Sequence, residues 1–459
     1  MDDILSHELS ETPLSLADST GHLHPATSKA DLGHLLTADV STGSISEPIS
    51  QAVVTIIDGQ ALVQSIGKPD GAKTFGDLAD VFCHAVCCKQ GKRIDAVFDR
   101  YNVISIKAET RAKRVGKAPK RSIRLVIDGR DVPLPVNWSQ FINLPDNNAN
   151  LAEFLSDSLM DFGQTLTDRE IVTAGGFNEL LETRSSIGRG LEMLKADHEE
   201  ADNRIVLHAL EACEEGYERI IVFCRDTDVL VLLIHFANER CREAWMSAGT
   251  SKAPKFIKIV LPVKMRTNLP AFHAVTGCDA VSQFSGYGKT LAWRAYQKHF
   301  ALLQGLGIDE LSEETISSIE AFVCRLYSPK SNIKSVNELR CYMFQKGNCD
   351  VEKLPPTHDA LLHHIHRAHY QCKIWRLASQ PIQTLQPPTE NGWKMDAESN
   401  TLKPVLTNMR PIPVNCTEIT KCGCTNCSTT RCSCRKKELQ CTAACSCTDF
   451  QCENPFKPK

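Results

Sequence analysis

Between residues 51 and 375, short apolar segments alternate with segments that have the spacing of amphipathic helices. The segments with helical patterns include FGDLADVFCHAVCC (75–88) and EEADNRIVLHALEACEEG (199–216). Five apolar segments have the length of strands: VVTIID (53–58), AVFD (96–99), RIIVFC (219–224), VLVLLI (229–234) and FIKIVL (256–261). This alternation is typical of a mainly parallel sheet that helices cover on both faces, so the sequence predicts an α/β fold.

The segments on either side of this region differ from it in composition. Residues 1–50 are rich in polar residues and are predicted to be mostly disordered, with one short helix in SKADLGHLLTA (28–38). Residues 376–415 contain six prolines among polar residues and are predicted to form a semi-extended linker. The last segment, 416–459, is too small and too rich in cysteine to have an ordinary core, and we expect metal to hold it together.

The net charge of the chain is −3, so any nucleic-acid contact has to be local. No unbroken apolar run reaches the roughly 18 residues that a transmembrane helix needs. The first residues, MDDILSHELSET, have no signal-peptide core. These features predict a protein inside the cell, where thiols stay reduced and a dense cysteine tract indicates metal rather than disulfides.

Acidic residues follow three of the predicted strands. Asp58 and Asp99 end their strands, and Asp226 and Asp228 follow the third one. The carboxyl ends of parallel strands meet at one edge of a sheet, where functional groups gather. Glu200 and the nearby Asp202 lie in the first turn of a predicted helix, where the helix dipole favours acids.

Taken singly, each of these acids is more simply explained as a turn or capping residue. Taken together, clustered carboxylates without cations would repel one another strongly in a cleft of low dielectric. Mg²⁺ or Mn²⁺ would relieve that repulsion, and two such ions about 4 Å apart can clamp the attacking and leaving oxygens of a phosphodiester. The sequence therefore predicts a divalent-metal site at this edge.

The segments EEADNRIVLHALEACEEGYERIIVFCRDTDVLVL and VTGCDAVSQFSGYGKTLAWRAY resemble the flap-endonuclease/XPG-like branch of the PIN nucleases, over roughly residues 52–300. The resemblance implies a metal-dependent nuclease with two Mg²⁺ or Mn²⁺ ions. It implies seven acidic ligands, all present here: Asp58, Asp99, Glu200, Asp202, Asp226, Asp228 and Asp279.

The chain departs from the family in three places. Position 202 is Asp where the family commonly has Glu, about fifty residues precede the first strand, and the segment between Asp99 and Glu200 is long. We expect an insertion at about 125–195, which includes RLVIDGRDVPLPVNW. The shorter side chain should perturb metal spacing slightly, and the other two departures bear on how a substrate strand would thread.

Two further motifs suggest contacts with phosphates. The turn that contains Gly286, Gly288 and Lys289 lacks the first glycine of a Walker A motif and fits the phosphate-binding turn of a helix–hairpin–helix; the alternative is a plain glycine-rich connection. The basic stretch 107–124 matches the region that forms a helical arch in the related nucleases, with Lys107 and Arg114 as candidates to neutralise the scissile phosphate. The same stretch suits a solvated helix face or a nuclear-import signal, so we expect a nuclear location.

Nine cysteines in the tail follow the spacing C-x-C-x₂-C-x₄-C-x-C-x₆-C-x₃-C-x-C-x₄-C. They are Cys422, Cys424, Cys427, Cys432, Cys434, Cys441, Cys445, Cys447 and Cys452. Structural zinc takes four ligands, and nine thiolates fill the twelve positions of three Zn²⁺ ions if three thiolates bridge. The spacing therefore predicts a compact cluster of about three zinc ions.

The tail is similar to the tesmin/TSO1-like CXC module, which implies DNA binding. Nine thiolates with three Zn²⁺ ions leave a net charge near −3, so binding has to depend on a local basic patch. Its members are Lys421, Arg431, Arg435, Lys436 and Lys437. The alternative is a structural zinc knot without a nucleic-acid partner.

Three functions are compatible with these features. The first is a metal-dependent, structure-specific DNA nuclease that the CXC module delivers to branched or single-strand/double-strand junctions. The second is a non-catalytic DNA-binding or chromatin protein that keeps the nuclease fold as a scaffold, and a pairing of this kind resembles proteins derived from mobile elements. The third is a nuclease that acts on RNA. The presence of acids at all seven positions favours the first.

Overall fold

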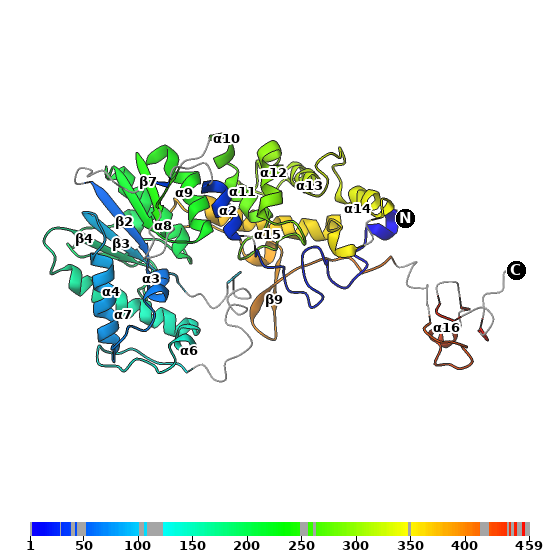
Figure 1. Cartoon of the computed structure of the whole chain (residues 1–459), viewed down its shortest axis with the longest axis horizontal. Helices are drawn as coiled ribbons and strands as arrows, with labels where there is room; N and C mark the ends of the chain where they lie inside the picture. Colours follow the sequence, from blue (N-terminus) through cyan, green and yellow to red (C-terminus); the bar gives the residue numbers. More distant parts are fainter. Residues whose placement is uncertain are drawn as a thin grey trace.

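A computed structural model of the chain describes most of its residues (Figure 1). The described ranges are 2–27, 29–37, 42–43, 52–100, 105–107, 123–247, 256–259, 263–347, 350–413, 422–437, 440–441, 445–447 and 452–454. The predicted α/β class is confirmed, because a mainly parallel sheet lies between helices and a cysteine-rich cluster follows at the C-terminal end (Figure 1).

The sheet has eight strands in the order β1-β8-β7-β6-β2-β3-β4-β5. Its central strands run parallel to one another, and β5, β8 and β1 add antiparallel edges. The strands are β1 (Thr42–Gly43), β2 (Val53–Asp58), β3 (Arg93–Val97), β4 (Glu170–Ala174), β5 (Thr183–Ser185), β6 (Arg219–Phe223), β7 (Glu243–Ser247) and β8 (Phe256–Lys258).

Helices cover both faces of this sheet. Alternate residues of β2 serve the two cores, since Val54 and Ile56 pack into one cluster and Ile57 into the other. One face carries α8 (Ala201–Glu214) and α9 (Thr227–Arg240), and the other carries α4 (Phe75–Cys87) and α7 (Pro145–Gly163) (Figure 1). Two short helices, α3 (Gly59–Ile66) and α6 (Trp138–Ile142), join the second group.

A mainly helical part extends from the sheet to the right in Figure 1. Its longest helix, α15, packs along α11 and contributes Trp375 to the main core. The elements of this part are α10 (Val263–Arg266), α11 (Leu269–Val275), α12 (Lys289–His299), η2 (Phe300–Leu303), α13 (Glu313–Tyr327), α14 (Val336–Gln345), η3 (Val351–Lys353) and α15 (His358–Arg376). No helix in the described ranges is long and apolar enough to span a membrane.

The prediction of a strand at VLVLLI (229–234) is wrong, because this segment lies inside α9. Asp226 starts the helix: its carboxylate accepts a hydrogen bond from the amide of Asp228, and its carbonyl accepts one from the amide of Leu230. The run is buried on all sides, so its hydrophobicity shows no helical period. Short apolar runs of this kind cannot be assigned from periodicity alone.

The expected insertion at about 125–195 contains part of the central sheet. β4 lies within it and pairs in parallel with β3, from Arg93 opposite Glu170 to Val97 opposite Ala174. The long helix α7 in the same segment packs against β4. The segment is therefore integral to the fold rather than an addition at its surface.

Both flanking segments are more ordered than their composition predicts. In the N-terminal segment, Leu5, Leu16 and Leu32 are buried, and α1 (Asp2–Leu5) lies beside α14. Arg340 on α14 donates to the carbonyl of Leu5 at 3.0 Å. The predicted helix at 28–38 is confirmed as α2 (Lys29–Thr37).

The proline-rich segment folds back onto α15 instead of extending. It contains η4 (Pro388–Glu390) and a hairpin of β9 (Trp393–Asp396) and β10 (Thr401–Pro404). Trp393 packs edge-on against Tyr370 of α15, with ring centroids 5.6 Å apart. Cys213 and Cys241 form a disulfide between the end of α8 and the residue after α9, contrary to the expectation that the scattered thiols stay reduced.

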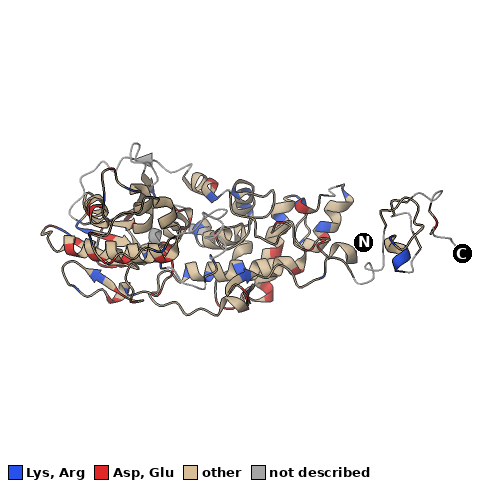
Figure 2. Ribbon diagram, turned by 90° about the horizontal axis from the view of Figure 1, so that it is seen from below, with Lys and Arg blue, Asp and Glu red and all other residues tan. Residues whose placement is uncertain are grey.

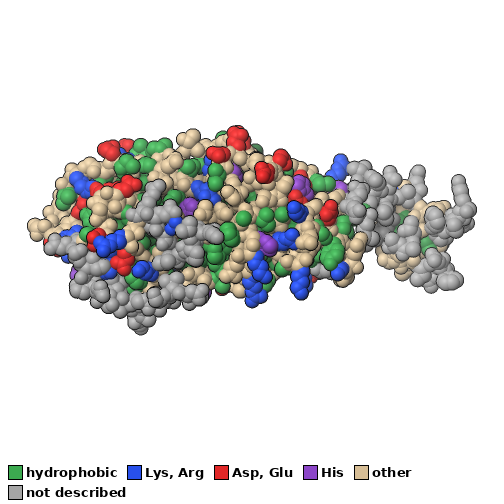
Figure 3. All heavy atoms as spheres, turned by 90° about the horizontal axis from the view of Figure 1, so that it is seen from above, with side chains coloured by type: hydrophobic (Ala, Val, Ile, Leu, Met, Phe, Trp, Pro, Cys, Tyr) green, Lys and Arg blue, Asp and Glu red, His purple; other side chains and the backbone are tan. Residues whose placement is uncertain are grey.

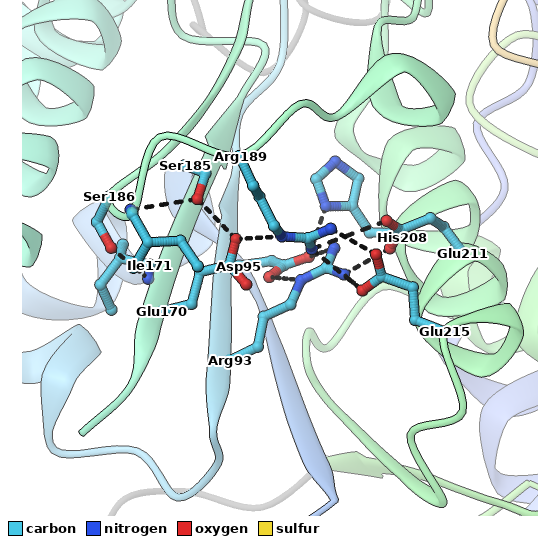
Figure 4. Close-up of polar contacts among 11 residues, drawn as sticks. Arg93, Asp95, Glu170, Ile171, Ser185, Ser186, Arg189, His208, Glu211 and Glu215 are labelled. Carbon is cyan, nitrogen blue, oxygen red and sulfur yellow. Dashed lines mark hydrogen bonds and ion pairs between the residues drawn. The ribbon is translucent and has the colours of Figure 1, made fainter. Parts of the chain in front are cut away.

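A buried polar network lies at the amino ends of β3 and β4 (Figure 4). The guanidinium of Arg93 is fully buried and donates to both carboxylate oxygens of Asp95, at 2.7 and 2.8 Å. It also donates to Glu215 at 3.0 Å and pairs with Glu211, while His208 bonds to Asp95 at 2.7 Å. Burial acts against the charge of Asp95, but Arg93 holds the pKa of this carboxyl below its usual value.

We predict that Arg93→Met lowers the free energy of unfolding by about 3–5 kcal/mol, because it leaves Asp95 buried without a counter-charge. The control is Arg242→Met, which removes the exposed pair of Arg242 with Glu218 and should cost about 0–1 kcal/mol. Denaturant unfolding of both variants measures the difference. Equal effects would show that the buried network does not contribute more than a surface pair.

Candidate functional site

The carboxyl ends of the parallel strands bring acidic side chains together, as the strand order requires. Asp58 ends β2 and caps α3, where its Oδ1 accepts from the amide of Ala61 at 2.8 Å. Gly59 makes this turn possible, since a Cβ there would lie 2.5 Å from the ring of Phe98. Asp99 follows β3, and its Oδ1 accepts from the amide of Ala201 at 2.7 Å.

Asp99 therefore ties the end of β3 to the N-terminus of α8. Glu200 is the N-cap residue of that helix, and Asp202 lies in its first turn, as the sequence predicts. Asp226 and Asp228 start α9 directly after β6. Four chain segments thus deliver carboxylates to one edge of the sheet.

Asp202, Asp226 and Asp228 form the centre of this group. One carboxylate oxygen from each lies within 4.8 Å of the other two. Asp228 is almost fully buried, and its Oδ1 lies 2.6 Å from Nε2 of His273 on α11. Asp279, which follows α11, lies near enough to share a cation with Asp226 and Asp228.

That shared cation is the ammonium of Lys29, at the start of α2. Its Nζ lies 2.8 Å from Asp226, 2.9 Å from Asp228 and 3.6 Å from Asp279. Lys29 carries no signature in the sequence, because the surrounding segment has only a weak helical pattern and no recognised motif. Only packing of the N-terminal segment against the sheet edge reveals it.

Lys107 supplies a second cation on the other side of the group. Its Nζ lies 2.5 Å from Glu200, and the side chain is largely buried. Lys107 therefore reaches the acidic edge, and its contact with a scissile phosphate stays a prediction. Arg114, the other candidate for this role, lies outside the described residues.

Burial and mutual repulsion govern the charges of the acids. Burial, with the charge of Asp99, raises the pKa of Asp58 to about 7. Burial also raises the pKa of Glu200 to about 7, although Lys107 acts in the opposite direction. The pKa of Asp202 rises well above its usual value because the group is buried and faces Asp226.

Asp228 differs from its neighbours. Burial acts to raise its pKa, but the charge of Lys29 and the hydrogen bond from His273 hold that pKa well below its usual value. Asp228 is therefore more firmly ionised than Asp58, Glu200 or Asp202. The acids whose pKa values are raised would gain most from an additional cation.

The residues at this edge suit a hard divalent cation. Mg²⁺ and Mn²⁺ prefer carboxylate oxygens, and the closely spaced oxygens of Asp202, Asp226 and Asp228 provide them from two helix starts. Oε2 of Glu200 is buried and has no hydrogen-bond partner, so another ligand position lies nearby. Lys29 occupies the space between Asp226 and Asp228, and an ion bound to both would have to displace it.

The prediction that Lys289 holds a phosphate is wrong for the side chain as it lies here. Lys289 is fully buried, and its Nζ donates at 2.8 Å to the carbonyl of His273 and at 2.8 Å to Oγ1 of Thr276. Burial lowers its pKa to about 7. Gly286 and Gly288 do form the turn before α12, with Gly286 at φ +76°, so a contact of their amides with phosphate stays a prediction.

The nine cysteines of the tail converge in a separate cluster. The sulfur of Cys422 lies 3.4 Å from Cys427, 3.7 Å from Cys441 and 3.8 Å from Cys447. Two thiolates on one tetrahedral zinc are about 3.8 Å apart, as Zn–S bonds of about 2.3 Å require. Cys422 belongs to three different sets of four sulfurs with metal-site spacing, which suits a bridging ligand.

Basic residues lie beside this cluster in and near α16 (Ser433–Lys436) (Figure 2). Arg431, Lys436 and Lys437 are exposed. Arg435 is half-buried and donates to the carbonyls of Ser428 and Glu453, so part of its guanidinium holds the cluster together. Lys421 lies outside the described residues.

No protein-family model matches the chain, and no curated protein matches it. Among solved structures, a bacteriophage T5 D15 flap endonuclease in a pseudo-enzyme–product complex with DNA and metal ions aligns with 72% of this chain and 100% of its own, at 9% identity and a TM-score of 0.33. The function proposed below rests on the side-chain positions in this chain.

We predict that the folded tail binds about three zinc ions per chain, because nine thiolates can fill the ligand positions of three ions by bridging. Native mass spectrometry of the full chain measures the number. The control is Cys88→Ser, which replaces an exposed free cysteine outside the tail and should leave the zinc content unchanged. Two or fewer zinc ions in correctly folded protein would contradict a trinuclear cluster.

Proposed function

We propose that the chain is a divalent-metal-dependent nuclease that cleaves phosphodiesters in DNA at branched sites or junctions. One observation supports this most: the carboxylates of Asp202, Asp226 and Asp228 converge at the carboxyl edge of a parallel sheet, with Asp58, Asp99, Glu200 and Asp279 around them. Within the described ranges the acids outnumber the cations there, which favours additional positive charge.

In this proposal the acids hold two Mg²⁺ or Mn²⁺ ions, which supply an activated water and stabilise the leaving oxygen when bound. Asp228 is held in place by His273 and by the start of α9, so its carboxylate is pre-oriented. Asp99 fixes α8 to the end of β3 and thereby positions Glu200 and Asp202. Lys107 is the cation best placed to contact a phosphate near Glu200.

Lys29 supports a second candidate function. With Lys107, it supplies positive charge to the carboxylates without any metal ion. A protein that keeps the fold only as a scaffold would retain such a contact permanently. In that case the chain would be a non-catalytic DNA-binding protein.

Under either function we propose that the zinc-bound tail contacts DNA. Arg431, Lys436 and Lys437 are exposed on one short segment beside the cluster, which suits phosphate contacts. On the face of the main body in Figure 3, acidic and basic side chains are interspersed, so the local patch on the tail matters more than bulk charge. A nuclear location is proposed from the basic stretch 107–124, most of which lies outside the described residues.

We predict that Asp226→Asn lowers cleavage of flap or bubble DNA by about three orders of magnitude or more, because it removes a ligand from a set that acts as a unit. DNA binding, measured by fluorescence anisotropy, should remain. The matched control is Asp161→Asn on the exposed face of α7, which should cleave like the wild type. The same panel run on RNA of matched structure tests the preference for DNA. Wild-type protein that cleaves nothing with Mg²⁺ or Mn²⁺ would contradict the proposal.

The variant Lys29→Met separates the two candidate functions. It leaves Asp226, Asp228 and Asp279 without their shared cation, so the metal-free variant should lose about 3–5 kcal/mol of stability. For a metal site, Mn²⁺ at about 100 times its Kd should restore about 2.7 kcal/mol. Thermal unfolding with and without Mn²⁺ measures both effects.

Lys298→Met on α12 is the control for this experiment, because Lys298 is exposed. A metal site predicts that Mn²⁺ raises the midpoint of Lys29→Met by more than it raises that of the wild type. A scaffold predicts that Mn²⁺ leaves the variant as unstable as before.

A further inference from the structure

A cavity of about 300 Å³ lies next to the carboxylate site and shares Glu200 with it. Its walls come from four separate segments: residues 105–106, the start of α8 with the residues before it, the last turns of α15, and the proline-rich segment that folds back onto α15. Tyr370, Ile374, Leu385 and Pro388 make much of the wall apolar. A cavity of this size suits one small ligand at the lower end of the usual range.

Several polar side chains in the lining of this cavity have atoms without hydrogen-bond partners. Gln371 on α15 is fully buried, yet neither its Oε1 nor its Nε2 has a hydrogen-bond partner. Asn203 on α8 is 1% exposed, and its Oδ1 has none either. Both residues line the cavity, as does Glu200, whose Oε2 is the fourth such atom.

Buried polar groups without partners are rare in folded proteins, because each costs about 1–3 kcal/mol. Two helices that both place such residues in the lining of one cavity therefore favour a site for a polar ligand. Gln383, which also lines the cavity, donates from its Nε2 to the carbonyl of Ile374 at 3.0 Å, so the wall around the free groups is itself fixed.

We propose that this cavity binds a single unstacked nucleobase of the nucleic-acid strand that lies at the carboxylates. The inference rests on the proposed function, since it takes the strand's presence from there. A nucleobase has flat apolar faces and a polar edge, which matches apolar walls with a few converging amide and carboxylate groups. Tyr370 is the aromatic residue in the lining of the cavity, and we expect it to be the one that contacts such a base.

The polar groups favour guanine among the four bases. Oδ1 of Asn203 and Oε1 of Gln371 are acceptors, as is Oε2 of Glu200 when its carboxyl is ionised, and Nε2 of Gln371 donates. The pairing edge of guanine offers N–H donors at two adjacent positions beside one carbonyl acceptor. Thymine offers one donor between two acceptors, so it would leave the acceptors of the cavity unpaired.

The experiment compares short DNA strands that differ in one base. The reference strand is abasic throughout, and the others carry one guanine, adenine, cytosine or thymine at the centre. Because the phosphates are the same in all of them, contacts of the zinc-bound tail and of the lysines with the backbone cancel. Binding to the full chain is measured by fluorescence anisotropy with no Mg²⁺ or Mn²⁺ added.

We expect one guanine to strengthen binding about tenfold over the abasic strand, within the range for one stacked base. A single thymine should strengthen binding less than guanine does, because its pairing edge leaves acceptors of the cavity without donors. Equal gains from all four bases, or no gain from any, would overturn the proposal with the wild-type protein alone. The readout is binding without metal, so a failure of cleavage leaves this result unaffected.

The variant Gln371→Leu then tests the residue. It should abolish the gain from guanine while its thermal midpoint stays the same or rises, because it removes two buried polar atoms that have no partners in the protein. The control Gln164→Leu, at the exposed end of α7, should keep the gain. A lowered midpoint with the guanine preference intact would show that Gln371 has only a structural role.

Discussion

Repulsion among the carboxylates at the carboxyl edge of the sheet is the constraint on which the site depends. The parallel strands bring the carboxylates together, because β2, β3 and β6 all end at the same edge of the sheet. Asp228 is almost fully buried there, and its charge persists only because Lys29 and His273 face it. The N-terminal segment is thereby coupled to the site: α2 packs in the main core through Leu32 and Leu36 and carries the lysine that balances the charge.

The opposite edge of the same sheet shows a different solution. At the amino ends of β3 and β4, Arg93 and Arg189 meet Asp95, Glu170, Glu211 and Glu215 in direct pairs, and Figure 4 shows the acids arranged around the two guanidinium groups. Bidentate contacts hold that network together, so each acid in it already has a cationic partner. At the carboxyl edge, two lysines among the described residues face seven acids, and the raised pKa values of Asp58 and Glu200 mark a shortage of positive charge in that part of the chain. A shortage of that kind favours a site that takes up cations.

The parts of this arrangement that the sequence predicts are those with a local signature. The bounds of β2 and the clustering of Asp58, Asp99 and Asp226 follow from strands that end in acids. Lys29 has no local signature, because its partners lie about two hundred residues away. The strand expected at 229–234 is a helix because burial on every side removes the period on which such a prediction depends. Lys289 looks like a surface cation in the sequence, and only packing shows that its ammonium is buried.

The elements added to the sheet, rather than the sheet itself, carry what is particular to this chain. Any parallel sheet with acidic strand ends can gather carboxylates, so that edge specifies a kind of chemistry and little more. α2 brings a cation into the carboxylates, and α15 with the proline-rich segment builds a cavity against Glu200. The fully buried amide of Gln371 lowers the stability of the fold wherever nothing bonds to it. In the proposed role, Gln371 would find its partners on the base that enters the cavity, so substrate choice and stability would oppose each other in α15.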